Sequence, residues 1–237
     1  MKHWVVYFLS VAILSGGQMS YSEYLMRGTR AAFTAPSNVT LMGGAAIAVL
    51  ALRGYDDDIQ RFSQEQGFMS DGFSHQLDLY GGRWAYPVLI GMSCLTPGSK
   101  SERVERLKLS FSAVGVTAMT TWLIKGITSR ERPNGSDKRS FPSGHTSGSF
   151  TVAAVVEELY SKNAGSAAYL LAALVGAHRI HDDKHWLTDV IAGAALGTAV
   201  GKGFSQIYRE AENGSGASLI PDWNKGSVMV TVVMPIN

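Results

Sequence analysis

The chain has 237 residues, of which 46% are apolar and 17% are charged, and its formal net charge is +2 at pH 7. A charged fraction below the usual quarter, with this apolar content, excludes a disordered polyelectrolyte. The near-neutral charge excludes general affinity for nucleic acid, so strong anion binding would need a local cluster of cations. The single cysteine, Cys94, excludes an intramolecular disulfide and a cysteine-rich metal site.

Residues 1–20 have the pattern of a secretory signal peptide. The basic Lys2 precedes the uninterrupted apolar run Trp4–Leu14, and small residues follow at 15–17. A helix of this length covers about 16 Å, against a hydrocarbon core of about 30 Å. We therefore expect a signal peptide or an N-terminal anchor, and a protein exported to the cell envelope, either periplasmic or membrane-associated. A buried first helix of the domain is the alternative.

Residues 21–212 are expected to form one all-α helical bundle, because apolar positions recur at helical spacing between Gly and Pro breaks. In chain order, helices are predicted at Val39–Leu52, Tyr86–Leu95, Glu102–Lys125, from Ser143 to about Tyr160, and at Ala164–Ala177 and Trp186–Phe204. The first of these is expected to be buried. The acidic run 56–58 is expected in a solvated loop or a helix start, because three successive side chains point in different directions.

The remaining apolar stretches are short for membrane spans. The charge-free runs Trp84–Ser99, Leu109–Ile124, 163–177 and 190–201 all fall short of about 20 residues. The mean hydropathy is only +0.05. The sequence therefore favours a globular bundle over a polytopic membrane protein, and it leaves contact with a membrane open.

Two features concern packing. Gly193, Gly197 and Gly201 recur every four residues, which predicts a small-residue stripe that lets a neighbouring helix approach closely. The C-terminal tail, 213–237, reads as strand, turn and strand, with strands at Ser218–Pro221 and Ser227–Met234. We assign no function to this predicted β-hairpin.

Three segments carry residues suited to chemistry. In order, they contain Lys125 with Arg132-Pro133, then Pro142-Ser143-Gly144-His145, then Arg179 with His185 and Asp189. Ser143 is a natural N-cap, and the free N–H groups of a helix start bind anions. His145 would lie on that first turn. His185 and Asp189 are four residues apart, so on a helix the carboxylate would orient and stabilise the imidazole.

Phosphoryl transfer needs such a set of groups. Its transition state spreads negative charge over three oxygens, which cations and N–H donors stabilise. Two histidines with different neighbours can act as nucleophile and as proton donor. A metal site is the alternative for the three histidines at 178, 181 and 185, but no Cys or Glu completes it nearby.

The three segments together resemble the type 2 phosphatidic acid phosphatase superfamily, which includes bacterial class A acid phosphatases and vanadium-dependent haloperoxidases. The family pattern is Lys-x6-Arg-Pro, Pro-Ser-Gly-His and Ser-Arg-x5-His-x3-Asp, and the match covers about 84–204. His178 replaces the Ser of the third motif, which puts one hydrogen bond near the phosphate in doubt. The gap 134–141 between the first two motifs is short, which predicts an open mouth.

The resemblance implies a helical bundle and a role for each motif residue. His185 would attack phosphorus and form a phosphohistidine, supported by Asp189, and His145 would protonate the leaving alcohol and then activate water. The phosphate oxygens would be held by Lys125, Arg132, Arg179, Ser143 and the N–H of Gly144. The expected protein is a phosphomonoesterase that needs no metal or cofactor and acts on a lipid phosphate or a small soluble ester.

Two other functions remain open. The same residues hold vanadate in haloperoxidases, although this chain is short for that role. A catalytically idle envelope scaffold is the second alternative, against which the retention of every charged motif residue argues. Neither the substrate nor the oligomeric state can be read from the sequence.

Overall fold

The computed structural model describes residues 19–212, 217–222 and 227–232, so the predicted signal peptide lies almost wholly outside the described residues. The expected all-α bundle is confirmed. Its α-helices are α1 (Tyr21–Thr34), α2 (Pro36–Leu52), α3 (Asp56–Gln66), α4 (Asp71–Leu79), α5 (Ala85–Leu95), α6 (Lys100–Thr128), α7 (Gly144–Leu159), α8 (Lys162–His181) and α9 (Leu187–Glu212). A 3₁₀ turn, η2 (Arg53–Tyr55), and a π-helical turn, η3 (Tyr80–Trp84), join neighbouring helices.

The two strands β1 (Ala217–Asp222) and β2 (Ser227–Val232) form an antiparallel pair, as the C-terminal pattern predicted. Ala217 lies opposite Val232 in this pair. The six predicted helices are present, although α9 continues to Glu212 instead of ending near Phe204, and α1, α3 and α4 are not among them. The longest described helix, α6, begins with a capping box between Ser99 and Glu102.

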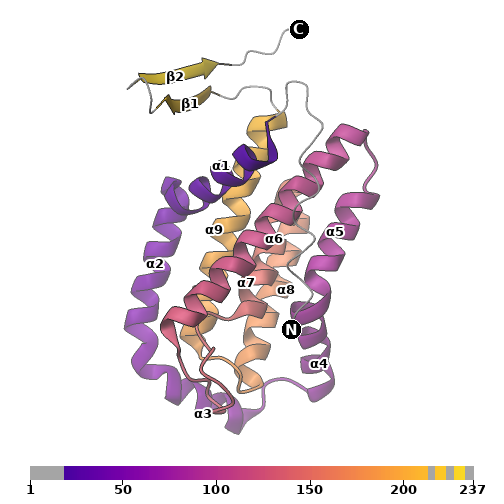
Figure 1. Cartoon of the computed structure of the whole chain (residues 1–237). Coiled ribbons are helices and arrows are strands. Elements are labelled where there is room, and N and C mark those ends of the chain that lie inside the picture. Colours follow the sequence, from indigo (N-terminus) through magenta and orange to yellow (C-terminus); the bar gives the residue numbers. More distant parts are fainter. Residues whose placement is uncertain (1–18, 213–216, 223–226, 233–237) are drawn as a thin grey trace.

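Helix α7 lies at the centre of the bundle and packs against α6, α8 and α9 (Figure 1). The glycine stripe of α9 makes its close contact with α7 possible, as predicted. A Cβ atom on Gly197 would lie 2.1 Å from the carbonyl oxygen of Ser147, and one on Gly201 would lie 2.5 Å from the Cβ of Ala154. The two backbones therefore touch only because these positions carry no side chain.

Helix α2 differs from the prediction in one respect. It ends at Leu52 as expected, but it is not buried, since Asn38 is the one residue of this helix that the structure buries. Large apolar side chains on it face outward, and those of Ile47 and Leu50 are 70% and 77% exposed. Helix α2 packs against α9 and α1 on one side, and the apolar side chains on its other side are exposed.

Helix α6 buries several small polar side chains beside Leu109 and Ala113, and it has large apolar side chains on its outer face. Thr117 and Thr121 are buried and share hydrogen bonds with Thr151 and Ser147 of α7, at 2.7 and 3.0 Å. The outward face carries the exposed large side chains Phe111, Met119, Trp122, Leu123 and Ile127. Small polar residues between helices and apolar residues outside are typical of helices that pack in lipid.

Two helical segments, Pro36–Gln66 and Lys100–Thr128, are long and apolar enough to cross a membrane by length and composition. Only 6% and 33% of their most apolar windows are buried, so burial inside a soluble core does not account for them. The preference for a globular bundle rested on four charge-free runs that did not include α2, whose residues 36–52 carry no charge. The exposed apolar faces instead fit a membrane-associated protein.

Candidate active site

The motif residues gather at one end of the bundle. This is the end where α6 and α8 finish, where α7 and α9 begin, and where α3 crosses beneath them (Figure 1). The first motif continues from α6 into the loop 129–143, the second opens α7, and the third runs from the end of α8 into the first turn of α9. Residues that are up to 64 positions apart in the sequence thus come from neighbouring helix ends.

His185 and Asp189 form a buried couple. The imidazole is 2% exposed, and its Nδ1 lies 3.5 Å from Oδ2 of Asp189 and 3.5 Å from Oγ of Ser140. The Ser140 hydroxyl and the N–H of Trp186 also donate to Oδ2. A carboxylate facing Nδ1 favours the tautomer with the proton on that atom, which leaves Nε2 with a free lone pair.

The surroundings of His185 favour its neutral form. Burial lowers the pKa of the imidazole to about 4, and the charges of Lys125 and Arg179 add to this, while the hydrogen bond with Asp189 acts in the opposite direction. A neutral ring with a free Nε2 is the form that can act as a nucleophile.

Arg130 holds the other oxygen of Asp189, and the sequence analysis missed it. One nitrogen of its guanidinium donates to Oδ1 of Asp189 and to the Thr188 hydroxyl, both at 2.7 Å, and the other donates to Asp56, also at 2.7 Å. The ring of Trp186 lies 5.4 Å from the guanidinium carbon. Arg130 occupies one of the six x positions of the first motif, Lys-x6-Arg-Pro. Its place inside the motif is the sequence feature that could have identified it.

The acidic run begins helix α3, which is one of the two predicted alternatives, but its first residue, Asp56, is buried at 3% exposure. Its carboxylate accepts hydrogen bonds from the N–H and hydroxyl of Thr188 as well as from Arg130. Asp56 and Thr188 are 132 positions apart, and no local pattern pairs them.

The predicted cations lie around the same place. Arg132 points one guanidinium nitrogen at Nε2 of His185, at 3.4 Å, and ties its Nε to Asp137 at 2.8 Å. Lys125 donates to the carbonyl groups of Arg139 and Ser140. Arg179 is 6% exposed, and its Nε is buried without a hydrogen-bond partner in the described residues. A buried guanidinium with an unused donor is suited to an anionic ligand.

The second motif begins α7 as predicted, with Ser143 as the N-cap. Its side chain does not cap the helix but accepts a hydrogen bond from Thr146 at 2.8 Å. A Cβ atom on Gly144 would lie 3.9 Å from Cε of Lys125, so the ammonium stem runs beside this helix start. His145 follows on the first turn, and burial lowers its pKa, with a further contribution from Arg179.

Asp78 of α4 is a second carboxylate that the sequence analysis missed. Its Oδ1 lies 2.6 Å from Arg179 and 3.2 Å from Nε2 of His145. His178, where the family pattern has Ser, is fully buried and bonds to the Ser74 hydroxyl at 2.7 Å while its Nε2 lies 3.4 Å from Asp78. His178 thus connects α8 to α4.

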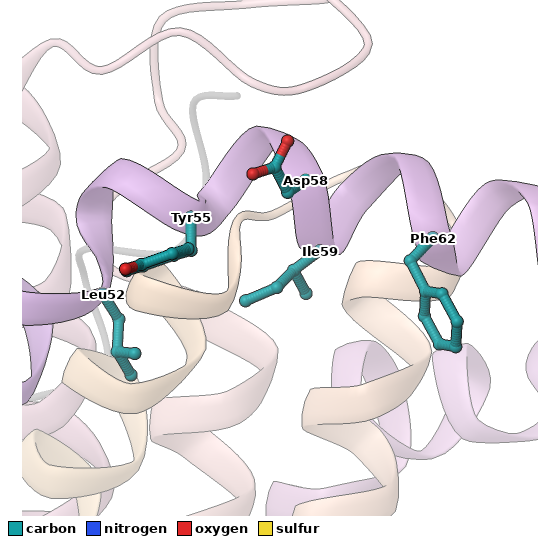
Figure 2. Close-up of a pocket in the computed structure, with 5 residues that line it drawn as sticks. All are labelled: Leu52, Tyr55, Asp58, Ile59 and Phe62. Carbon is teal, nitrogen blue, oxygen red and sulfur yellow. The ribbon is translucent and has the colours of Figure 1, made fainter.

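A separate open groove of about 410 Å³ lies on the outer face of α2 and α3. Figure 2 shows its lining, Leu52, Tyr55, Asp58, Ile59 and Phe62. None of the motif residues lines this groove, and its walls are mainly apolar. It is therefore distinct from the cationic site on the inner side of α3.

The site combines a neutral imidazole, a second imidazole, three cations and a helix start around one place. Among the residues that the structure describes, no group of three or more His, Cys, Asp or Glu side chains is arranged to hold a metal ion. The three cations and the N–H groups of the helix start can bind a phosphate dianion and stabilise the charge of its transition state.

Comparisons with known proteins agree with this fold and these motifs. The family model described as the PAP2 superfamily matches residues 107–212. A lipid A 1-phosphatase of Porphyromonas gingivalis is 38% identical over 76 residues, which is 31% of this chain and 17% of that protein. The chain thus aligns with only about a sixth of that curated relative.

Two crystal structures share the fold. LpxE of Aquifex aeolicus superposes with a TM-score of 0.52 at 22% identity, over 65% of this chain and 93% of that one. A transmembrane PAP2-type phosphatidylglycerolphosphate phosphatase of Bacillus subtilis superposes with a TM-score of 0.60 at 18% identity, over 73% of this chain and 96% of that one.

Proposed function

We propose that this chain, whose residues 107–212 match the PAP2 superfamily model, is a member of that superfamily and a membrane-associated phosphatase that hydrolyses a lipid phosphate monoester through a phosphohistidine. The observation that carries the proposal is the geometry around His185. Its Nε2 faces the guanidinium of Arg132 at 3.4 Å, while its Nδ1 faces Asp189. A phosphate bound to these cations would lie against the free lone pair of the imidazole.

The reaction would proceed in two steps. Nε2 of His185 attacks phosphorus, the P–O bond to the alcohol breaks, and His145 supplies the proton that the leaving oxygen takes up. His145, now neutral, then takes a proton from a water molecule that attacks the phosphohistidine and releases inorganic phosphate. Lys125, Arg132 and Arg179 would hold the phosphoryl oxygens in both steps, with Ser143 and the N–H of Gly144 at the helix start.

A lipid substrate is favoured by the outer surface of the bundle. The outward sides of α2 and α6 are apolar and largely exposed, while the cationic site lies at one end of the same helices. A phosphate headgroup can reach that end while its acyl chains stay beside the apolar faces. The relatives named above include phosphatases of lipid A and of phosphatidylglycerolphosphate. We extend the proposal to export and an envelope location because residues 1–20 have a signal-peptide pattern.

Phosphate release by the purified protein in detergent tests this function. We expect turnover of detergent-dispersed lipid phosphates, with faster release than from soluble nucleotides or sugar phosphates. EDTA should leave the rate unchanged, and vanadate should inhibit because it adopts the geometry of the transition state. Loss of activity in EDTA that added divalent metal restores would contradict the mechanism. Halide oxidation with vanadate and peroxide, without phosphate release, would favour the haloperoxidase alternative.

The pH dependence provides a second test. Protonation of His185 removes the nucleophile, and burial holds its pKa at about 4. For an aryl phosphate, we therefore expect kcat/KM to fall at low pH as His185 becomes protonated. The midpoint of this fall, the enzyme's acidic limb, should lie near pH 4, well below the ordinary histidine pKa of about 6.5. Two esters with different second ionisation constants separate the substrate's limb, which moves between them, from the enzyme's limb. An enzyme limb at pH 6 or above would contradict this assignment.

A further inference from the structure

Asp78 lies against the basic groups on one side of the site. Its Oδ1 is 3.2 Å from Nε2 of His145, 2.6 Å from Arg179 and 3.4 Å from Nε2 of His178. Its side chain is 44% exposed, whereas those of Arg179 and His178 are 7% and 0% exposed. The carboxylate of Asp78 thus contacts these basic side chains on one side and solvent on the other.

The chain around Asp78 also fixes the ring of His145. The π-helical turn η3 follows α4, and its Gly81 and Gly82 lie directly against the imidazole. A Cβ atom on Gly82 would lie 2.4 Å from Nε2 of His145, and one on Gly81 would lie 3.3 Å from Cδ2. Backbone therefore forms one wall of the ring's pocket and Asp78 closes it. π-Helical turns are frequent at functional sites.

The charges around His145 explain why a carboxylate is needed there. Arg179 and His178 of α8 and His185 of the following loop all oppose a proton on this imidazole, as does burial, so its pKa lies below the ordinary value. Asp78 is the group in this set that favours the proton. Burial acts to raise the pKa of Asp78, but His145, Arg179 and His178 outweigh it and keep this carboxyl ionised.

We propose that Asp78 is a positioning residue that pairs with Nε2 of His145, holds the ring in place and favours its protonated form, from which a proton is transferred to the leaving alcohol. The proposal rests on the phosphatase function above. The Nε2 proton stays shared with Asp78, and the proton on Nδ1 passes to the leaving oxygen as the P–O bonding electrons move to that oxygen. The neutral Nδ1 then accepts a proton from the attacking water, so the ring is restored for the next cycle.

The leaving group provides the test. An alkyl or lipid alkoxide needs a proton as it departs, whereas an aryl phenolate with a low pKa does not. In Asp78→Asn we expect kcat/KM to fall about 100-fold for an alkyl phosphate, in the range typical of general acid catalysis, and by less than about threefold for an aryl phosphate. This parameter reports the steps up to release of the alcohol, so later hydrolysis of the phosphohistidine does not affect it.

Two variants complete the experiment. Asp78→Glu keeps the charge and should recover part of the alkyl rate, and a retained aryl kcat/KM shows that Asp78→Asn is folded. Asp71→Asn makes the same chemical change at an exposed position in the first turn of α4 and should change neither rate. An equal loss for both esters would overturn the proposal and show that Asp78 only orients Arg179. A wild-type protein inactive on both esters would refute the phosphatase function itself.

Discussion

Replacing His185 with alanine should abolish phosphate release, lowering kcat by at least about 1,000-fold. The imidazole is the nucleophile of the proposed reaction, and its Nε2 is the ring nitrogen that faces Arg132. Without it the cations can still bind phosphate, so we expect KM to change far less than kcat. Rates on an aryl phosphate and a dispersed lipid phosphate, measured on the same preparations, give both parameters.

The intermediate offers a direct check on the same residue. Wild-type protein quenched during turnover of a labelled ester should carry label that is stable in base and lost in acid, as expected for a phosphorus–nitrogen bond. His185→Ala should carry none. His75→Ala is the matched control, because His75 is exposed on α4 and should be dispensable for labelling. Retention of more than about a tenth of the activity in His185→Ala would exclude a phosphohistidine at this position.

Replacing Arg130 with methionine should destabilise the protein and slow it. The change leaves Asp189, which is fully buried, and Asp56, which is 3% exposed, without their shared cation. Breaking a buried ion pair from one side costs about 3 kcal/mol, which corresponds to a fall in Tm of about 6–12 °C for a chain of this size. Thermal unfolding in detergent measures this effect.

Activity should respond as well, because Arg130 acts on the nucleophile through Asp189. Burial tends to raise the pKa of Asp189, and the hydrogen bonds from His185 and Ser140 together with the charge of Arg130 keep it below its ordinary value. With Arg130 gone, the carboxylate is less well held, and we expect kcat to fall more than KM rises. Arg130→Lys should recover part of the stability but not the two-sided contact, since an ammonium lacks the planar fork.

A surface ion pair serves as the control for this prediction. Arg61 pairs with Asp58 on the outer side of α3, and both side chains are more than 60% exposed. Exposed pairs contribute little, so Arg61→Met should leave both Tm and kcat unchanged within error. Equal effects of the two substitutions would mean that the Arg130 network does not hold the site together.

Much of the fold could be predicted from the sequence because it depends on local patterns. The helix boundaries near Leu52, Leu95 and Ser143 follow from nearby Gly and Pro residues, whose conformational preferences are local. The glycine stripe of α9 also predicted the close approach of a neighbouring helix, which is α7, because a residue without a Cβ atom allows close backbone contact in any fold. The eight candidate site residues were predicted from motif spacing in the same way. The chain places them at one end of the bundle, and their roles stay a prediction.

The tertiary structure decided what depends on which side chains face one another. Whether the apolar residues of α2 and α6 point inward or outward is not determined by their spacing, because a lipid-facing helix and a core helix carry the same residues. Asp56 and Asp78 have no local pattern that indicates their partners. They reach Arg130 and His145 only because α3 and α4 fold back across the helix ends, and long-range ion pairs of this kind form between residues that the sequence keeps far apart.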